Sequence, residues 1–281
     1  MEDHFKHCAA LVRESDRDRY LATLFAPADK RDALFALYAF DTEIARVRDL
    51  AREPMPGEIR LQWWQEVVSG ERAREAAANP VALALLDTQT RYDLTGDALA
   101  NVIEARRFDI YNRPFSDIDD FQSYATKTAG AIFELAVRIL ANGNVPTIPG
   151  LATEAGLAQT IADVPARLPR HAARRQLYVP LEILRQYQAE PDDIFAMRAT
   201  PEVRAALAAL RLRARRHLAH VGAATVPQNI QPAFLSLAPL WQWLREMERA
   251  DYDPFRPPQT ALWRRQWRIW RAAKSFRRIG G

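Results

Sequence analysis

The chain of 281 residues has few of the features that stabilise secreted or membrane-spanning proteins. Its single cysteine, Cys8, excludes an internal disulfide and fits a reducing compartment, and we interpret it as an inert thiol. No stretch approaches about 18 consecutive apolar residues, so the sequence predicts no transmembrane helix. The first residues lack the apolar core of a signal peptide. We therefore expect a cytoplasmic location, with a peripheral contact at the inner face of the cytoplasmic membrane left open.

Glycine is scarce, with ten residues, and the alternating runs of Val, Ile and Thr that are typical of strands are missing. Ala, Leu, Arg and Glu are abundant, and these side chains lose little conformational freedom in a helix. Apolar positions recur at helical spacing along the whole chain, which predicts an all-α fold. The expected helices cover residues 3–18, 29–51, 58–69, 80–90, 94–111, 117–141, 150–164, 180–188, 199–221, 230–249 and 259–276.

Local signals fix some of the helix ends. Asp29, Asp117 and Thr200 are residue types that cap helix N-termini, and Gly222 is expected to end a helix. No low-complexity stretch separates two cores, and no internal repeat of fixed period is present. The sequence thus predicts a single domain over residues 1–281.

Charge is distributed unevenly along the chain. Residues 251–281 contain eight Arg or Lys and two Asp, a local charge of +6. Because the whole chain carries +4, the first 250 residues sum to −2. A basic tail on a nearly neutral body predicts an anionic partner surface. No nucleic-acid recognition fold accompanies the charge, so we expect a membrane surface or a protein face rather than nucleic acid.

The segment 255–281 is expected to form a basic, Trp-rich C-terminal helix. Three tryptophans recur in it at i, i+4 and i+7, with arginines beside them. Such a helix can lie in a lipid interface with its indoles at headgroup depth. The alternative is a terminal helix that packs its tryptophans on the core and turns its arginines to water. The residues concerned are Trp263, Trp267, Trp270, Arg264 and Arg268.

Two segments carry the main functional signal. They are Tyr38–Asp49, with the sequence YAFDTEIARVRD, and His171–Pro180, with the sequence HAARRQLYVP. They resemble the segments of squalene and phytoene synthases that each carry an Asp-x-x-x-Asp pair. In that superfamily the pairs hold Mg²⁺ ions against the diphosphate of a prenyl substrate, because Asp side chains four residues apart share one helix face. The resemblance implies an isoprenoid-synthase-type helical bundle with a central cavity.

Three of the four expected aspartates are replaced. Aligned on Tyr-Ala-Phe, the first pair falls on Ala45 and Asp49. Asp41 cannot replace the missing acid, because at about 1.5 Å of rise per residue it lies roughly 12 Å from Asp49 along the helix axis. Aligned on Tyr-x-Pro, the second pair falls on Arg167 and His171. The usual metal site of the superfamily is therefore not expected here.

Replacing carboxylates by Arg and His reverses the sign of the local field, so the second segment should favour anions directly. Asp163 would restore one acid only if four residues were inserted after it. Guanidinium groups bind phosphate or carboxylate oxygens without a metal. The alternative is that the arginines are solvated or pair with carboxylates in helix packing. The candidate anion, diphosphate or partner site consists of Arg174, Arg175, Tyr178, His171 and Arg167.

Within the superfamily the chain resembles a branch that contains an assembly factor for mitochondrial respiratory complex I and bacterial relatives. The likeness rests on Leu61–Trp64, His171–Pro180 and Ala250–Phe255. It implies a non-catalytic assembly or interaction factor, without a cofactor or bound metal. The expected partner is a subunit or assembly intermediate of a respiratory complex.

Two other functions stay open. One is an active Mg²⁺-dependent head-to-head prenyl transferase, with Asp49, Asp163 and Arg174 in its metal and diphosphate site. The other is a lipid-binding protein that keeps the cavity and holds a prenyl chain or an anionic lipid. For the small residues of the cavity motif, tight helix packing is the alternative. The residues that match the family's cavity lining are Tyr38, Tyr124, Thr128, Ala129 and Gly130.

Overall fold

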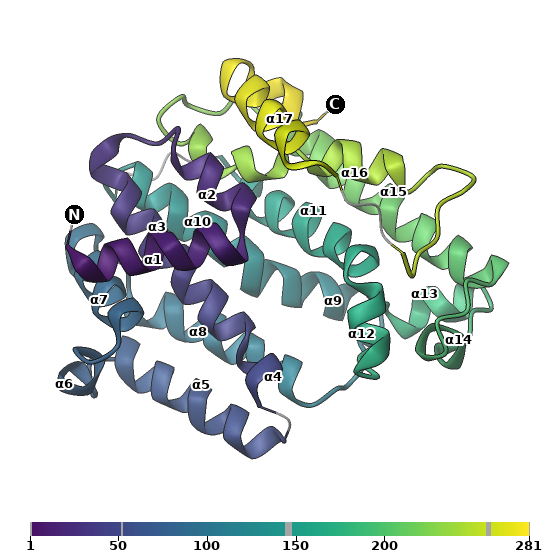
Figure 1. Ribbon diagram of the computed structural model, residues 1–281, viewed down its shortest axis with the longest axis horizontal. Coiled ribbons are helices and arrows are strands. Elements are labelled where there is room, and N and C mark those ends of the chain that lie inside the picture. The colour runs from purple at the N-terminus through teal and green to yellow at the C-terminus, as the bar shows by residue number, and fades with distance from the viewer. Residues whose placement is uncertain (1, 52, 144–147, 257–259, 281) are drawn as a thin grey trace. The chain divides into compact units, whose positions relative to one another are not determined.

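The computed structural model describes residues 2–51, 53–143, 148–256 and 260–280. These residues form helices and connectors with no strand among them, which confirms the all-α prediction (Figure 1). Their contacts group into two compact units, both built from non-contiguous segments. Unit 1 comprises Met1–Tyr111, Ala131–Pro149 and Thr225–Ser236, and unit 2 comprises Asn112–Gly130, Gly150–Ala224 and Leu237–Gly281. The single-domain organisation stays a prediction.

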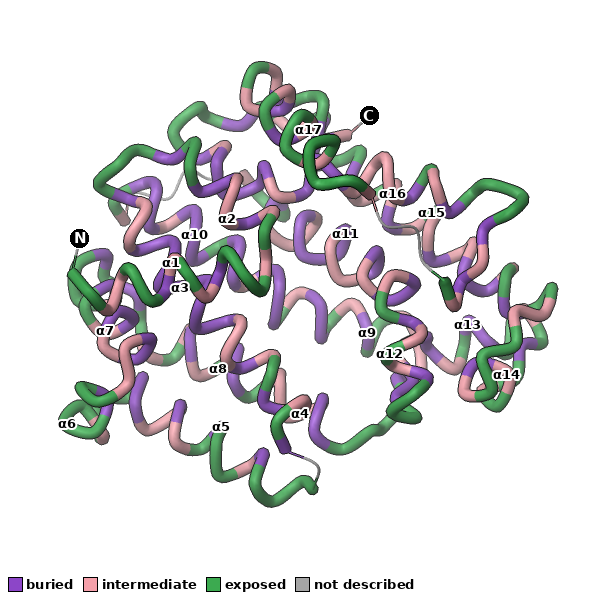
Figure 2. Tube along the Cα trace, viewed as in Figure 1, coloured by how far each residue is buried: buried purple, intermediate pink, exposed green. Residues whose placement is uncertain are grey.

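Unit 1 is built around one buried helix, α3. Eight consecutive apolar residues occupy positions 33–40, and a helix that is apolar on all sides is stable only when it is surrounded. α1, α7 and α10 pack against it, and Figure 2 shows its buried course. The elements of unit 1 are α1 (Asp3–Ser15), α2 (Arg17–Thr23), α3 (Ala28–Ala45), α4 (Val47–Leu50), α5 (Pro54–Val68), α6 (Ala73–Ala76), α7 (Pro80–Tyr92), α8 (Gly96–Arg106), η1 (Arg107–Ile110), α10 (Ala131–Leu140) and η3 (Gln231–Ala233).

Unit 2 is built on the contact between α11 and α15. α11 also packs on α9 and on η2, a π-helical turn. A Cβ added at Gly156 in α11 would lie 2.3 Å from the backbone nitrogen of Gly130, so the two backbones approach too closely for a side chain at position 156. The elements of unit 2 are α9 (Ile118–Ala125), η2 (Thr126–Gly130), α11 (Leu151–Ala166), α12 (Leu168–Ala173), α13 (Leu181–Gln186), α14 (Pro191–Phe195), α15 (Pro201–Ala223), α16 (Leu240–Glu246), α17 (Leu262–Lys274) and η5 (Phe276–Ile279). The short turn η4 (Leu235–Leu237) contains the last boundary between the units.

The predicted N-caps at Asp117 and Thr200 are confirmed, whereas the start predicted at Asp29 is wrong, because α3 begins at Ala28 and no side chain caps it. The Asp117 side chain accepts a hydrogen bond from the backbone N–H of Asp120 at 2.8 Å, and the Thr200 hydroxyl accepts one from the N–H of Val203 at 3.2 Å. The predicted helix stop at Gly222 is wrong, because this residue lies inside α15. Its lack of a side chain instead allows close packing, since an added Cβ would lie 2.5 Å from the backbone nitrogen of Gly280.

Several elements depart from the expected helices. The predicted helix over 29–51 divides into α3 and α4, the one over 94–111 into α8 and η1, and the one over 230–249 into η3, η4 and α16. The predicted helix over 3–18 ends at Ser15, because the Asp16 carboxylate caps a second helix, α2, by accepting the N–H of Arg19 at 3.0 Å. The predicted helix over 117–141 contains a π turn at Thr126–Gly130. Within this turn the Thr128 hydroxyl donates to the carbonyl of residue 124 at 2.7 Å. Such turns are frequent at functional sites in helical proteins.

Candidate functional site

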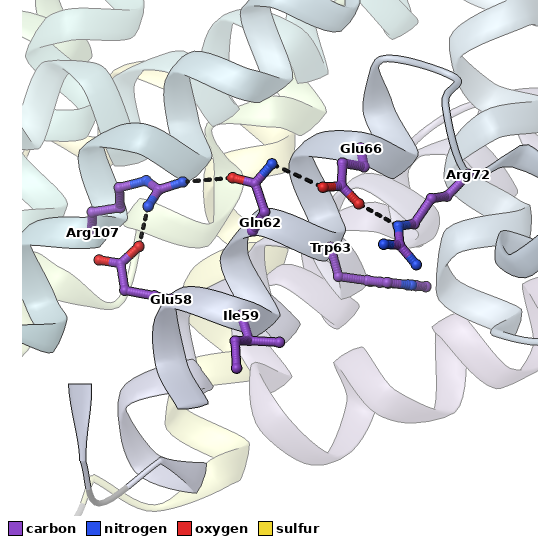
Figure 3. Close-up of a pocket in the computed structure, with 7 residues that line it drawn as sticks. All are labelled: Glu58, Ile59, Gln62, Trp63, Glu66, Arg72 and Arg107. Atoms are coloured by element: carbon purple, nitrogen blue, oxygen red, sulfur yellow. Dashed lines mark hydrogen bonds and ion pairs between the residues drawn. The ribbon is translucent and has the colours of Figure 1, made fainter. Parts of the chain in front are cut away.

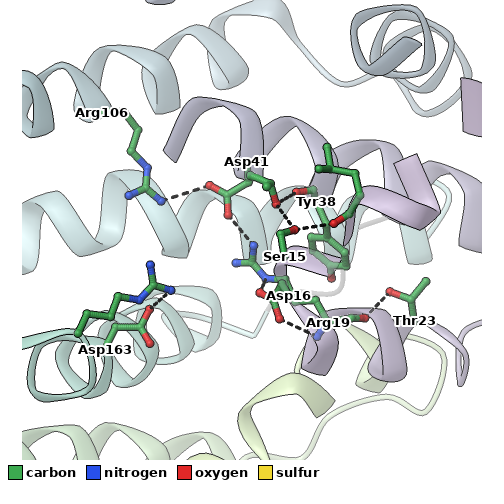
Figure 4. Close-up of polar contacts among 11 residues, drawn as sticks. Ser15, Asp16, Arg19, Thr23, Tyr38, Asp41, Arg106 and Asp163 are labelled. Carbon is green, nitrogen blue, oxygen red and sulfur yellow. Dashed lines mark hydrogen bonds and ion pairs between the residues drawn. The ribbon is translucent and has the colours of Figure 1, made fainter. Parts of the chain in front are cut away.

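In the first of the two family-like segments, Tyr38–Asp49, the one buried carboxylate is that of Asp41, and it forms two ionic contacts. Asp41 lies in α3, where Arg19 of α2 donates from Nη1 to its Oδ2 at 2.5 Å. Arg106, at the end of α8, donates from Nη2 to the other oxygen, Oδ1, at 3.2 Å (Figure 4). The Arg19 guanidinium also lies 5.0 Å from the centre of the Tyr38 ring. Both oxygens of Asp41 are therefore occupied by guanidinium groups.

The charge balance keeps this carboxyl ionised. Burial alone would raise the pKa of Asp41, but the two neighbouring arginines outweigh it and lower the pKa below its ordinary value. Burial raises the pKa of the Tyr38 phenol to about 12, so that hydroxyl stays neutral. A cation bound at Asp41 would lie next to two guanidinium groups, which would repel it. Ala45 is the last residue of α3, and Asp49 follows in the separate short helix α4.

Arg19 and Arg106 are functional candidates that the sequence does not reveal. They lie 22 residues before and 65 residues after Asp41, at no recognisable spacing from it. Arg19 also lies 3.6 Å from Asp16, and Arg106 lies 3.5 Å from Asp109. The result is a buried ionic network around Asp41, one turn before Ala45 in α3.

Near the second segment, Asp163 forms an ion pair with Arg167, the residue at one of the expected aspartate positions. Arg167 contacts Asp163 with 3.2 Å between Nη2 and Oδ2, one turn apart at the end of α11. His171 follows in α12 and is half-buried. Burial, reinforced by Arg167, Arg170 and Arg174, lowers the pKa of His171 to about 3. The imidazole is therefore neutral at physiological pH, which corrects the expectation that it adds positive charge to the local field.

Arg174 and Arg175 are both exposed. Arg175 adopts a left-handed backbone with φ of 51°, and its guanidinium lies 4.7 Å from the ring centre of Phe195 in α14. Its Nη2 lies 3.9 Å from the Asp192 carboxylate. These contacts match the helix-packing alternative for Arg175. A role of either arginine in anion binding stays a prediction.

Tyr178 belongs to an aromatic cluster in unit 2. Its ring centre lies 4.5 Å from that of His171, 6.2 Å from Phe115 and 6.5 Å from Tyr124. The backbone holds the cluster together, because the N–H of Leu181 donates to the carbonyl of Phe115 at 2.9 Å. The structure thus brings together residues from two predicted groups, the anion site and the cavity lining. Phe115, which links them, was not predicted.

The small residues of the cavity motif lie at the π turn. Thr128, Ala129 and Gly130 are buried there, and Gly130 meets Gly156 of α11 at backbone distance. Tight helix packing therefore requires a glycine at position 156, whereas a Cβ added at Gly130 would meet its neighbours only at ordinary contact distances of 3.5 Å or more. Whether these residues also line a prenyl-chain cavity stays a prediction.

A groove of about 400 Å³ lies along α5 in unit 1 (Figure 3). Its charged groups are paired with one another. Arg107 pairs with Glu58, and Arg72 pairs with Glu66, while Gln62 donates to Glu66 at 3.0 Å. With its polar groups satisfied in this way, the groove offers no cluster of convergent, unpaired donors or acceptors among these residues. The groove is lined by Glu58, Ile59, Gln62, Trp63, Glu66, Arg72 and Arg107.

The C-terminal helix α17 turns its tryptophans outward. Trp263, Trp267 and Trp270 are 63%, 48% and 50% exposed, whereas Ile269 and Ala272 are buried. The alternative in which the tryptophans pack on the core is therefore wrong, because the smaller apolar residues occupy the packed face. Residues 257–259 and 281 of the predicted C-terminal segment lie outside the described residues.

A basic side chain lies over the ring of each of the three exposed tryptophans of α17. The Arg264 guanidinium lies 5.2 Å from the ring centre of Trp263, and that of Arg271 lies 4.4 Å from the ring centre of Trp267. The Lys274 ammonium lies 6.0 Å from the ring centre of Trp270. α17 contains five basic residues and no acidic one. No helix in the described part of the chain is both long and apolar enough to cross a membrane.

The helical arrangement is that of the isoprenoid synthase fold. A crystal structure of a dehydrosqualene synthase superposes with a TM-score of 0.80, covering 97% of this chain and 96% of that one at 14% identity. A squalene synthase from Alicyclobacillus acidocaldarius superposes with a TM-score of 0.73 at 25% identity, covering 90% of this chain and 95% of that one. A model of the squalene/phytoene synthase family matches residues 12–271, and the chain belongs to this family.

Relatives of two kinds resemble the sequence. The human protein named NADH dehydrogenase (ubiquinone) complex I, assembly factor 6, is 29% identical over 257 residues, which cover 91% of this chain and 76% of that protein. The 15-cis-phytoene synthase of Synechococcus elongatus is 24% identical over 270 residues, covering 91% and 87% of the two chains. The family thus includes named synthases and named assembly factors, and the chain resembles both.

Proposed function

We propose that the chain is a non-catalytic member of the squalene/phytoene synthase family that acts as an assembly factor for a respiratory membrane complex of the complex I type. The observation that carries the proposal is that the acids near both expected metal-ligand pairs contact arginines: Asp163 contacts Arg167, and both carboxylate oxygens of Asp41, one turn before Ala45, accept from Arg19 and Arg106. A Mg²⁺ site needs carboxylate oxygens that face an ion. In this chain Asp41, on α3, instead forms ion pairs with Arg19 of α2 and Arg106 of α8.

The second segment supports the same proposal. Its residual acid, Asp163, contacts Arg167, which occupies one of the expected aspartate positions. The other position is His171, which is neutral and a poor ligand for Mg²⁺ because that ion prefers oxygen. The similarity to human complex I assembly factor 6 supports the assembly role.

Loss of catalysis is tested with the substrates of the family. Purified protein is incubated with farnesyl or geranylgeranyl diphosphate and Mg²⁺, and released pyrophosphate and hydrocarbon products are measured beside an active phytoene synthase. We expect no turnover above the no-protein control. Robust formation of a C30 or C40 hydrocarbon would establish the prenyl transferase alternative. Tight binding of the diphosphate without turnover would favour the lipid-binding alternative.

The assembly role is tested separately in the organism that encodes the chain. We expect a deletion to lower NADH:quinone oxidoreductase activity and the amount of fully assembled complex on native gels, with other respiratory complexes unaffected. Re-expression of the wild-type chain should restore both. A deletion strain with a normal amount of assembled complex would contradict the assembly role, whatever the result of the prenyl transferase assay.

The proposal includes a contact between α17 and an anionic membrane surface. Exposed tryptophans at helical spacing, each with a basic side chain on its ring, suit the boundary between headgroups and acyl chains. A basic residue near an anionic leaflet contributes about 1 kcal/mol. Replacing Arg264, Arg271 and Lys274 by Gln should therefore cost about 3 kcal/mol, which is roughly a 100-fold loss of affinity.

Flotation with vesicles of phosphatidylcholine, with and without phosphatidylglycerol, measures this contact. We expect binding only to the anionic vesicles and its loss when Trp263, Trp267 and Trp270 are all replaced by Ala. A matched control removes three large exposed apolar side chains elsewhere, at Met55, Ile59 and Leu212, and should bind as the wild type does. Equal binding of the two triple variants would exclude α17 as the membrane contact.

A further inference from the structure

Two imidazoles and one carboxylate converge on the surface of unit 2, outside the segments Tyr38–Asp49 and His171–Pro180. Glu154 lies in the first turn of α11, and His217 and His220 lie one turn apart near the end of α15. Oε2 of Glu154 lies 2.8 Å from Nδ1 of His217 and 3.1 Å from Nδ1 of His220. The three ligand atoms all lie within 4.8 Å of one another.

The helices that carry the three side chains are held in fixed register. α11 and α15 make the most extensive helix contact of unit 2 and lie side by side in Figure 1. Ala155 follows the carboxylate directly and is fully buried, as is Leu218, between the two histidines. Gly222, one turn further, packs at backbone distance against Gly280. A site on two packed helices is positioned more accurately than a site on loops.

The spacing of the donor atoms suits a transition metal ion. Zn²⁺ bonds to imidazole nitrogen and carboxylate oxygen are about 2.0–2.2 Å long, so tetrahedral donors lie roughly 3.3 Å apart. The observed separations of 2.8 and 3.1 Å from the Glu154 oxygen differ from this by a few tenths of an ångström. The two imidazole planes are perpendicular, with ring centres 6.4 Å apart. Small rotations of three side chains on rigid backbones would complete the geometry.

Solvent can supply the remaining ligand. The side chain of His217 is 17% exposed, that of Glu154 30% and that of His220 67%. An ion could therefore reach the site from water on the His220 side and keep one water in its coordination shell. Two imidazoles with one carboxylate and an open position form a common zinc ligand set.

We infer that Glu154, His217 and His220 bind one divalent first-row transition metal ion, with Zn²⁺ as the reference ion, and that the ion clips α11 to α15. Imidazole nitrogen selects such ions over Mg²⁺ and Ca²⁺, which prefer oxygen. The site is thus chemically distinct from the Mg²⁺ site of the family's synthases. It also goes beyond the sequence-based expectation of no bound metal, and it does not depend on the proposed assembly role.

A second cluster in unit 1 provides a matched control. Glu2, His4 and Asp87 also place three ligand atoms within 4.8 Å of one another. This cluster has only one imidazole, and its glutamate is 74% exposed, so it should bind a transition metal much more weakly. The His4→Gln variant therefore removes a comparable surface histidine without touching the proposed site.

The test uses untagged, full-length protein stripped with a chelator. Zn²⁺ is titrated at pH 8 against a chromophoric chelator, and Co²⁺ is titrated separately to record its visible d–d absorption. We expect one equivalent per chain. Glu154→Gln, His217→Gln and His220→Gln should each weaken Zn²⁺ binding at least tenfold and alter or abolish the Co²⁺ bands, and His4→Gln should leave both unchanged.

The clip predicts a further change that simple surface adsorption would not produce. Zn²⁺ should raise the Tm of the wild-type chain and of His4→Gln, but not that of Glu154→Gln. Circular dichroism of each variant without metal verifies that it is folded. Absence of a stoichiometric ion, equal affinity in all the variants, or loss of binding in His4→Gln would overturn the inference. In any of those cases the three residues form only a hydrogen-bonded triad.

Discussion

Replacing Asp41 by Asn tests whether this buried acid stabilises the fold or serves as a metal ligand. The substitution keeps the shape of the side chain and leaves Arg19 and Arg106 facing an uncharged amide in a buried position. Removing one partner from a buried ion pair costs about 3–5 kcal/mol. Arg19 keeps Asp16 at 3.6 Å and Arg106 keeps Asp109 at 3.5 Å. We therefore expect a loss at the lower end, about 3 kcal/mol of unfolding free energy.

Urea denaturation followed by far-ultraviolet circular dichroism measures this loss. Because the pKa of Asp41 is lowered in the folded state, its contribution is present above the unfolded pKa of about 3.9 and is lost as pH falls through the folded value. The difference between wild type and variant should thus shrink at acidic pH. Asp3→Asn removes an exposed ion pair with Lys6 at 2.8 Å, and should leave stability close to that of the wild type.

The metal-ligand hypothesis predicts a different pattern for the same variant. If Asp41 bound Mg²⁺, then Mg²⁺ with inorganic pyrophosphate would raise the denaturation midpoint of the wild type, and Asp41→Asn would abolish that rise. We expect no rise in either protein. A variant that is as stable as the wild type without metal, but loses stabilisation by Mg²⁺ and pyrophosphate, would refute the structural role of Asp41.

Three further predictions follow from single contacts. The lowered pKa of His171, about 3 against 6.5 when unfolded, makes the native state less stable as pH falls below about 6.5. Between pH 7.5 and 5 this term should remove about 2 kcal/mol, and a pH series of urea midpoints should show a correspondingly smaller loss in His171→Phe. Gly156→Ala should cost about 3 kcal/mol, because its Cβ would lie 2.5 Å from the Cα of Gly130. Gly57→Ala, whose Cβ would meet only a side chain at 3.1 Å, should cost less in the same denaturation assay. Burial raises the pKa of the Cys8 thiol to about 12, so a thiol reagent at pH 8 should label it only after unfolding; rapid labelling of the native chain would contradict its burial.

The sequence predicts well those features that depend on neighbouring residues. Helix periodicity and the caps at Asp117 and Thr200 are local, because a cap is formed by a side chain and a backbone N–H three residues away. The sequence pattern does not predict α2, although its cap, Asp16, is equally local. The helical periodicity continues across Asp16, so the predicted helix over 3–18 places this residue in a helix interior.

Features that depend on distant partners could not be predicted in this way. The neutral state of His171 results from burial, and the fixed position of Asp41 results from arginines 22 and 65 residues away. The i, i+4, i+7 spacing of the tryptophans is compatible with either face of α17. Burial of Ile269 and Ala272 determines which face is packed. For the candidate metal site, the spacing of His217 and His220 is visible in the sequence, but Glu154 lies more than sixty residues away.

Because both units are built from non-contiguous segments, large deletions and small substitutions should affect this protein differently. The sequence moves from one unit to the other five times, so no single cut or deletion releases either unit as an intact piece. Removing a block of residues would leave both units without part of their packing. Replacing side chains on the existing helices, by contrast, leaves the course of the chain unchanged. The sequence-based prediction that Ala45, Arg167 and His171 stand at expected aspartate positions describes a change of that kind, which alters side chains on helices that are present.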